Sequence, residues 1–260
     1  MGFGYDDWRS VFYPTEMPAR NFLGYYSRIF NAVEIDSTFY GTPRATTLKR
    51  WAASIRVGFK FCLKTPRAIT HDAGLVNVQD EMKLFLERVS LLGDALGVVL
   101  LQFPPSFRSD NLQVLENFLA ELPSGYRFAV EIRDPSWMVV PAGGDEPVLA
   151  QLLTKYGVCW AAIMYPSLPE RIFATTDWLY IRWIGQHGSY EVHDYERVDR
   201  TENLTAWCDQ IQGLSDRLSE VYGFLNNDYA GFAVGTADHL KIILDLPRHD
   251  FSPPQQAIMF

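Results

Sequence analysis

The sequence has little cysteine. Cys62, Cys159 and Cys208 are far apart in a chain of 260 residues. Their odd number and wide spacing exclude a disulfide framework and a CxxC zinc knuckle. A chain without such a framework is typical of a reducing compartment, so we expect a cytoplasmic protein.

Long apolar runs and a surplus of basic residues are also missing. Nowhere do about 18 uncharged apolar residues follow one another, as a membrane-spanning helix requires. Residues 1–10 lack the basic stretch and apolar run of a signal peptide. With 23 Lys and Arg against 31 Asp and Glu, the formal net charge is −8. Because nucleic-acid binding depends on cations that neutralise phosphates, neither nucleic acid nor a membrane is expected as a partner.

What the chain does contain is an alternation of apolar and amphipathic segments. Strands are expected at 32–36, 58–64, 97–102, 127–133, 157–163, 178–183 and 221–226. Helices are expected at about 17–30, 46–54, 79–95, 109–121, 146–155, 200–219 and 231–245. This order predicts a parallel sheet covered by helices, and the length suits one α/β domain of the (β/α)8, or TIM barrel, class. The barrel should span residues 1–246, followed by an extended, proline-containing tail at 247–260.

The eighth strand has only residues 1–5 available, with the sequence Met-Gly-Phe-Gly-Tyr. We therefore expect the first strand to be very short, or the chain to begin inside it. The second case leaves a gap in the barrel wall that a partner or the C-terminal tail would cover.

The alternation of side chains along each strand predicts which of them point into the barrel. Val33 and Ile35, facing the helices, place Glu34 and Asp36 inside. The same count on the other strands places inside Lys60, Cys62, Lys64, Gln102, Ala129, Glu131, Arg133, Tyr180, Arg182 and Asn226. We interpret Cys62 as a small apolar filler rather than a nucleophile.

The inward residues nearest the carboxyl ends of the strands are all polar: Glu34, Lys64, Gln102, Glu131, Arg133, Arg182 and Asn226. Active sites of such barrels lie at this end, so the ring predicts a site. The alternative is a structural network in which Glu34, Glu131, Lys64 and Arg182 neutralise one another. Clustering at one end of the strands favours the site.

The loops that follow these strands are rich in proline and aromatic residues. They contain Phe39, Tyr40, Arg67, His71, Phe107 and Trp137. Flat aromatic surfaces suit a sugar or a base, and they also serve as ordinary lids over a barrel core.

Several segments together resemble one family. They are VFYP at 11–14, VEIDSTFY at 33–40, FKF at 59–61, KTPR at 64–67, TH at 70–71, LQFPPSF at 101–107, AVEIR at 129–133, PSW at 135–137, YIR at 180–182 and LNN at 225–227. In this order, over about residues 3–245, the chain is similar to the YecE-like family, domain of unknown function 72. The resemblance implies a TIM barrel without a settled activity.

The chain departs from the family pattern at both ends. The family's opening strand, of the type GTSGW, is present only as residues 2–5, and no His follows Asp228-Tyr229-Ala230-Gly231.

The first functional hypothesis is an enzyme, such as a hydrolase or isomerase, acting on a small anionic or polyhydroxylated substrate. Its phosphate or carboxylate would be held by Lys64, Arg67, Arg133 and Arg182. Glu34 or Glu131 would be the general acid or base, with His71 as another proton carrier. Gln102 and Asn226 would orient the substrate, and Tyr40 and Trp137 would contact it. No cofactor is expected; Mg²⁺ on Glu34, Asp36 and Glu131 is a minor variant of the metal-dependent hypothesis described next.

Two other hypotheses remain open. One is a metal-assisted phosphodiesterase acting on nucleic acid. Among the five histidines, only His71 lies in a predicted strand-end loop, although His187 and His193 could approach the mouth from the segment after residue 183. The other is a protein that binds a metabolite without converting it.

Overall fold

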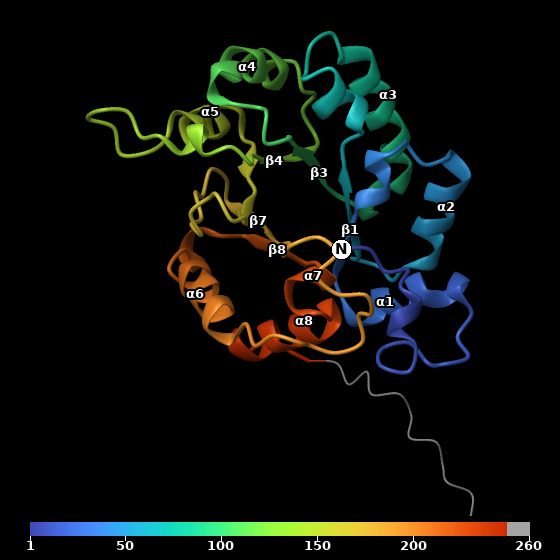
Figure 1. The fold of residues 1–260 in the computed structure, drawn as a ribbon. Helices are drawn as coiled ribbons and strands as arrows, with labels where there is room; N and C mark the ends of the chain where they lie inside the picture. The colour runs from blue at the N-terminus through green and yellow to red at the C-terminus, as the bar shows by residue number, and fades with distance from the viewer. Residues whose placement is uncertain (249–260) are drawn as a thin grey trace, which may run out of the picture.

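The computed structural model describes residues 1–248 and contains two parallel sheets that continue into each other (Figure 1). One sheet has the order β1 (Ala32–Ile35), β2 (Lys60–Lys64), β3 (Leu96–Gln102), β4 (Arg127–Glu131) and β5 (Cys159–Trp160). The other consists of β6 (Ala162–Met164), β7 (Trp178–Trp183) and β8 (Glu220–Leu225). Only Ala161 separates β5 from β6, and its N–H donates to the Val130 carbonyl at 2.9 Å. The predicted α/β fold with parallel strands is confirmed.

Helices surround the strands (Figure 1). They are α1 (Phe22–Ile29), α2 (Ala45–Ser54), α3 (Gln79–Val89), α4 (Leu112–Ala120), α5 (Val148–Tyr156), α6 (Thr201–Gln212), α7 (Asn227–Ala230) and α8 (Ala233–Ile243). All except α7 lie where the periodicity predicts a helix, with shifted ends. The helix expected at 200–219 stops at Gln212, and the one expected at 231–245 is preceded by the single turn of α7. Residues 165–177, between β6 and β7, form no helix. None of the helices in residues 1–248 has the length and apolar character needed to cross a membrane.

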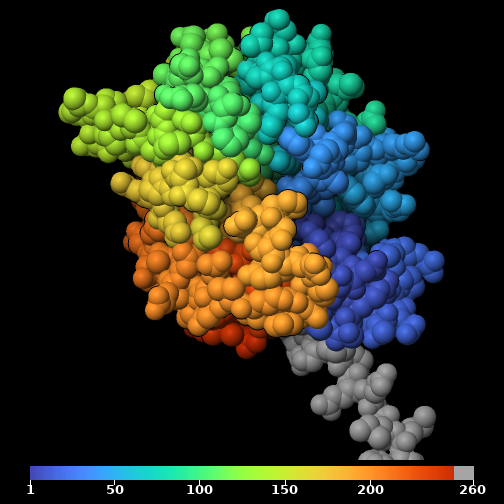
Figure 2. All heavy atoms as spheres, in the orientation of Figure 1, coloured from blue at the N-terminus to red at the C-terminus, as the bar shows by residue number. Residues whose placement is uncertain are grey.

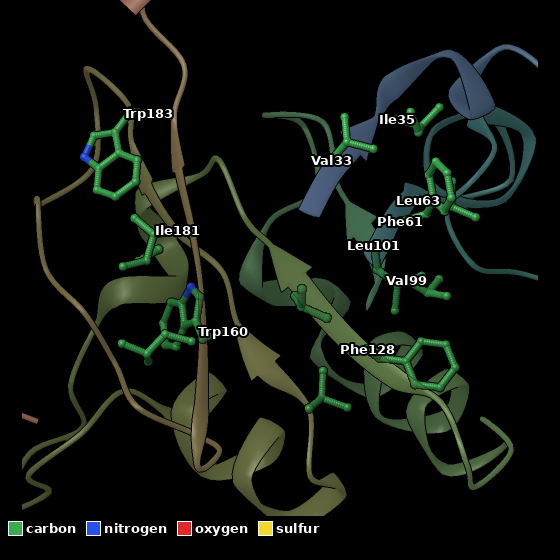
Figure 3. Packing of buried hydrophobic residues seen from close by; sticks show 14 of the residues in the cluster. Val33, Ile35, Phe61, Leu63, Val99, Leu101, Phe128, Trp160, Ile181 and Trp183 are labelled. Carbon is green, nitrogen blue, oxygen red and sulfur yellow. The ribbon is translucent and has the colours of Figure 1, made fainter. Parts of the chain in front are cut away.

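The core has two layers, and they confirm the predicted alternation. Val33, Ile35, Phe61 and Leu63 belong to the large cluster between the strands and the helices (Figure 3). The smaller cluster lies inside the ring of strands and consists of Met1, Cys62, Val98, Leu100, Ala129, Cys159, Ala161, Trp178, Tyr180, Tyr222 and Phe224. Cys62 is fully buried there as a free thiol, and burial raises its pKa. The side chain therefore fills space, as expected.

Residues 1–5 pair in no strand ladder, so the first strand is incomplete, as one of the two expected alternatives allowed. Among residues 1–248, two backbone hydrogen bonds link the chain start to β8 and β1. The Met1 nitrogen donates to the Leu225 carbonyl, and the Gly2 N–H donates to the Glu34 carbonyl at 2.8 Å. We call this junction the seam. In Figure 1 the N-terminus lies between β1 and β8.

On the amino-terminal side of Leu225, β8 is not paired with β1, so the seam is open there. The Asn226 N–H donates to the Trp183 carbonyl, so alternation along β8 turns the N–H and C=O groups of Val221 and Gly223 away from β7. Both residues are exposed. A cavity of about 750 Å³ lies beside them, lined also by Tyr26 of α1, the following Phe30 and aliphatic side chains of α8. Among residues 1–248, strand pairing thus runs around the ring except at the seam.

The predicted tail at 247–260 lies outside the described residues except for Pro247 and Arg248. The division into a barrel at 1–246 and a tail therefore stays a prediction.

Candidate functional site

The centre of the site is Arg182, which follows the alternation of β7 into the ring and is 3% exposed. Its Nε and Nη2 donate to the two carboxylate oxygens of Glu34 at 2.9 and 2.7 Å. Nη1 donates to Glu131 Oε2, and Nη2 also reaches Asp36 Oδ1 at 3.2 Å. A single guanidinium therefore joins carboxylates from β1 and β4 and from the turn after β1.

The carboxylates have further donors. The Tyr180 hydroxyl donates to Glu34 Oε2 at 2.6 Å, and Arg133 Nε donates to Glu131 Oε1 at 2.8 Å. Both glutamates are fully buried, as their inward positions on β1 and β4 require. Three of the four residues of the predicted ion network, Glu34, Glu131 and Arg182, are thus joined as that hypothesis expects.

The two buried glutamates differ in acidity. Burial raises the pKa of Glu34 to about 7, although Arg182 acts in the opposite direction. Burial also acts on Glu131, but Arg182 and Arg133 outweigh it and hold the pKa of that carboxyl below its ordinary value. Near neutral pH Glu131 is therefore ionised, whereas Glu34 is present in both its protonated and its ionised form. Carboxyl groups with separated pKa values are frequent in active sites.

Lys64 stands apart from this network. It ends β2, and its Nζ lies 4.0 Å from the centre of the Phe39 ring. Within residues 1–248 no hydrogen bond or ion pair involves this ammonium group. Burial, followed by the positive charge of Arg182, lowers the pKa of Lys64. The structural hypothesis, in which Lys64 neutralises a glutamate, therefore does not describe its position.

His71 lies against the same aromatic ring, 4.7 Å from it between centroids, and its Nδ1 is 2.9 Å from Thr70 Oγ1. Burial and then Lys64 lower the pKa of His71 to about 4. The imidazole is therefore neutral near pH 7 and weakly basic.

Arg133 lies at the rim, with 22% of its side chain exposed. Only its Nε is engaged by Glu131, and the guanidinium carbon lies 5.2 Å from the centre of the Tyr165 ring. Its two terminal nitrogens have no hydrogen-bond partner among residues 1–248. Arg133 is also one of the charges that lower the pKa of Lys64, so the two cations are within electrostatic reach of each other.

Three predicted substrate contacts make structural hydrogen bonds. The Gln102 amide donates to the Phe103 carbonyl, and Trp137, 3% exposed, donates from Nε1 to the Phe107 carbonyl at 2.8 Å. The Asn226 side chain accepts from the Asp228 N–H at 3.1 Å and caps α7. A role of these residues in substrate binding stays a prediction.

Two further predicted contacts lie on an outer surface. Tyr40 is 85% exposed, and Arg67 is paired with the exposed Asp72 at 2.9 Å. Both line a separate hollow of about 420 Å³ together with Leu84 and Phe85 from α3. The structure thus does not bring them into the Arg182 network.

A second cluster lies beside the mouth and contains His187 and His193, whose approach the sequence predicts but whose partners it does not identify. The His193 ring lies 3.1 Å from Asp7 Oδ2 and packs edge-on against Tyr5. On its other side, Nε2 is 3.9 Å from the buried Asp228, which His187 Nδ1 approaches to 3.4 Å. The segment that carries both histidines is orange in Figure 2 and lies beside the blue N-terminal residues. This segment has no periodic pattern, so the sequence indicates that the histidines could approach the mouth but not which residues they contact.

Gly185 anchors the start of that segment. Its φ is +72°, and a Cβ placed there would lie 2.3 Å from the Asp228 carbonyl oxygen. Only glycine fits both the left-handed backbone and this close approach.

The carboxylates considered for Mg²⁺, Glu34, Asp36 and Glu131, all bind Arg182. Within residues 1–248 no three His, Cys, Asp or Glu side chains are grouped so that they could hold a metal ion.

The sequence is similar to one protein family and to two curated proteins. The model described as "Protein of unknown function DUF72" matches residues 1–258. The UPF0759 protein YecE of Escherichia coli K12 is 35% identical over 133 residues, 51% of this chain and 48% of the relative. This match spans about half the length of that curated relative. The UPF0759 protein YunF of Bacillus subtilis is 25% identical over 97% of this chain and 96% of its own length.

Solved structures agree with the fold. A DUF72 family protein from Thermotoga maritima is 29% identical, with a TM-score of 0.77 over 94% of this chain and 96% of that one. One from Enterococcus faecalis has a TM-score of 0.76 over 98% and 97% of the two chains and, at 19% identity, supports the fold alone. Since the family model covers nearly the whole sequence, the chain belongs to the DUF72 family, as the motifs in its strands indicated.

Proposed function

We propose that the mouth of the ring binds a small anionic metabolite and that the protein is an enzyme acting on it. The observation that carries this proposal is the contrast between Arg182 and Lys64. Arg182 is neutralised by three carboxylates, whereas the ammonium of Lys64 has no ion-pair partner among residues 1–248. A half-buried cation without a counter-ion, at the catalytic end of a barrel, suits a ligand that carries negative charge.

The ligand's negative group would lie between Lys64 and Arg133. The terminal nitrogens of Arg133 offer the paired donors that match a carboxylate or phosphate, and Lys64 adds a point charge. The Phe39 and Tyr165 rings flank these cations and would border the bound molecule.

The buried glutamates would set the charge of the site rather than touch the substrate. With all groups ionised, Arg182, Arg133 and Lys64 balance Glu34, Glu131 and Asp36. Protonation of Glu34, whose pKa is about 7, adds one positive charge to the mouth. Anion affinity should therefore rise as the pH falls from 8 to 6. The rise should be smaller in Glu34→Gln, which removes the contribution of this carboxyl and leaves those of the Lys64 and Met1 amines, whose pKa values burial lowers.

A thermal-shift screen of anionic metabolites tests the proposal. A ligand at about 100 times its Kd stabilises the folded protein by roughly 2.7 kcal/mol. For each compound that raises the Tm, Lys64→Met and Arg133→Met should weaken binding at least about tenfold, the loss of one charge-assisted contact. Turnover of each bound compound is then measured.

Lys60→Met is the matched control. Lys60 begins the same strand, and its Nζ donates to the Asp94 carbonyl at 2.7 Å, at the opposite end of the ring. It should bind like the parent. If Lys60→Met and Lys64→Met weaken binding equally, the anion site is not at the mouth. Binding without turnover of any compound would favour the non-catalytic hypothesis.

A further inference from the structure

We propose that the side-chain amine of Lys64 is a nucleophile that forms an imine with a carbonyl group of the substrate. This inference rests on the proposed function, because the anionic substrate must first bind at the same rim. It adds the chemical class of the substrate and the bond that forms.

The first argument is position. Lys64 is the last residue of β2 and points to the inner side, opposite the outward Leu63. Catalytic side chains of this fold come from the ends of the strands. Lys60, on the same face of the same strand, lies four residues earlier at the non-catalytic end.

The second argument is that Lys64 has no counter-ion within the described residues 1–248. A half-buried lysine ordinarily pairs with a carboxylate, which keeps it protonated. The carboxylates that act on Lys64 electrostatically are occupied, because Asp36 binds Arg182 while Glu131 binds both Arg182 and Arg133. The Phe39 ring covers the amine without offering it a hydrogen-bond acceptor.

The third argument is acidity. Burial and the positive charges of Arg182 and Arg133 lower the pKa of Lys64, although Asp36 and Glu131 act against them. A lower pKa increases the fraction of neutral amine, the form that attacks a carbonyl carbon. Catalytic lysines that form Schiff bases are activated by desolvation or by a neighbouring cation, and both are present here.

The reaction balances without another reactant. The neutral amine nitrogen bonds to the carbonyl carbon, and the carbonyl oxygen takes up a proton to give a carbinolamine. Loss of that oxygen as water gives the protonated imine. Overall, one ammonium group and one carbonyl compound yield one iminium group and one water.

The substrate class follows from the neighbouring Arg133. Its unpartnered nitrogens would hold a carboxylate or phosphate while Lys64 reaches the carbonyl carbon. We therefore infer an aldehyde or ketone that carries one of these anions. Pyruvate represents the carboxylates, and dihydroxyacetone phosphate represents the phosphates.

Reductive trapping tests the inference. The full chain is incubated with either probe and sodium cyanoborohydride near pH 7, and modified lysines are located by peptide mass spectrometry. Lys64 should be modified at least about tenfold faster than the exposed Lys49 and Lys83, which serve as internal controls. Lys64→Arg, which keeps the positive charge, should abolish the fast adduct. The probe that reacts at the lower concentration identifies the anion.

The outcomes separate this inference from the proposed function. If a probe binds at the mouth in the thermal-shift assay but Lys64 is modified no faster than Lys49 and Lys83, imine formation is overturned and the anion site stands. If neither probe binds and Lys64 is not selectively modified, the inference is also overturned, and the metabolite screen decides on the anion site. Fast Lys64 modification that persists in Arg133→Met supports the imine while removing Arg133 from substrate recognition.

Discussion

Replacing Arg182 with methionine should destabilise the fold by roughly 3–5 kcal/mol, the cost of removing one partner from a buried ion pair. The substitution keeps a long apolar stem but leaves the fully buried Glu34 and Glu131 without the guanidinium that joins them. In a chain of this length the Tm should fall on the order of 10 °C. Differential scanning calorimetry at pH 7 measures the shift.

Arg127→Met is the matched control. Arg127 also joins two strands through a glutamate, but its side chain and that of Glu220 are 43% and 40% exposed. Exposed pairs contribute about 0–1 kcal/mol, so the control should melt within a few degrees of the parent. An Arg182→Met protein as stable as Arg127→Met would show that the central network does not hold the strands together.

Two isosteric substitutions, Glu131→Gln and Glu34→Gln, should have opposite effects at pH 8. Glu131→Gln loses a carboxylate that two arginines hold ionised and should destabilise the protein by roughly 3 kcal/mol. Glu34→Gln should be at least as stable as the parent, because burial makes the ionised form of Glu34 unfavourable.

The sign of the pH effect follows from the direction of each pKa shift. The pKa of Glu34 is raised to about 7, so between about pH 4.5 and 7 the folded state binds the proton more tightly than the unfolded state. This contribution to stability is present at low pH and lost as the pH rises through 7. For Glu131, whose pKa is lowered, the contribution is present above the ordinary pKa and lost as the pH falls.

Urea unfolding of the three proteins between pH 5 and 8 measures both effects. The advantage of Glu34→Gln over the parent should shrink towards pH 5, where the parent's Glu34 is protonated. The deficit of Glu131→Gln should stay nearly constant over this range. Parallel curves for the parent and Glu34→Gln would mean that Glu34 has an ordinary pKa in the folded protein.

Most of what the sequence could predict came from the alternation of inward and outward side chains along each strand. Because outward Val33 and Ile35 fix the alternation of β1, Glu34 had to be inside, and the same reasoning placed Arg182. Alternation treats Glu34 and Glu131 as equivalent, however. Their difference arises because Arg133, two residues beyond Glu131 in the chain, turns back to it. Among residues 1–248 no second arginine does so for Glu34. This depends on side-chain direction, which periodicity does not encode.

Other residues illustrate the same limit. An aromatic in a strand-end loop can lie over a ligand or inside the core, and Trp137 lies in the core, stacked on Phe107. The His193–Asp7 contact joins two irregular segments that are 186 residues apart. No local pattern signals such a meeting, so the sequence predicted the ring of polar residues better than its surroundings.

The seam has a consequence for the order of folding. Its two residues in contact, Met1 and Leu225, are 224 positions apart, whereas β1 and β2 pair Ala32 with Lys60. Closing the longer loop costs roughly 2 kcal/mol more chain entropy, and only two backbone bonds compensate. The ladders from β1 to β4 should therefore form early and the seam last. The amide of Gly2 should exchange with deuterium well before that of Leu63 in β2, so the ring opens at the same place where it closes.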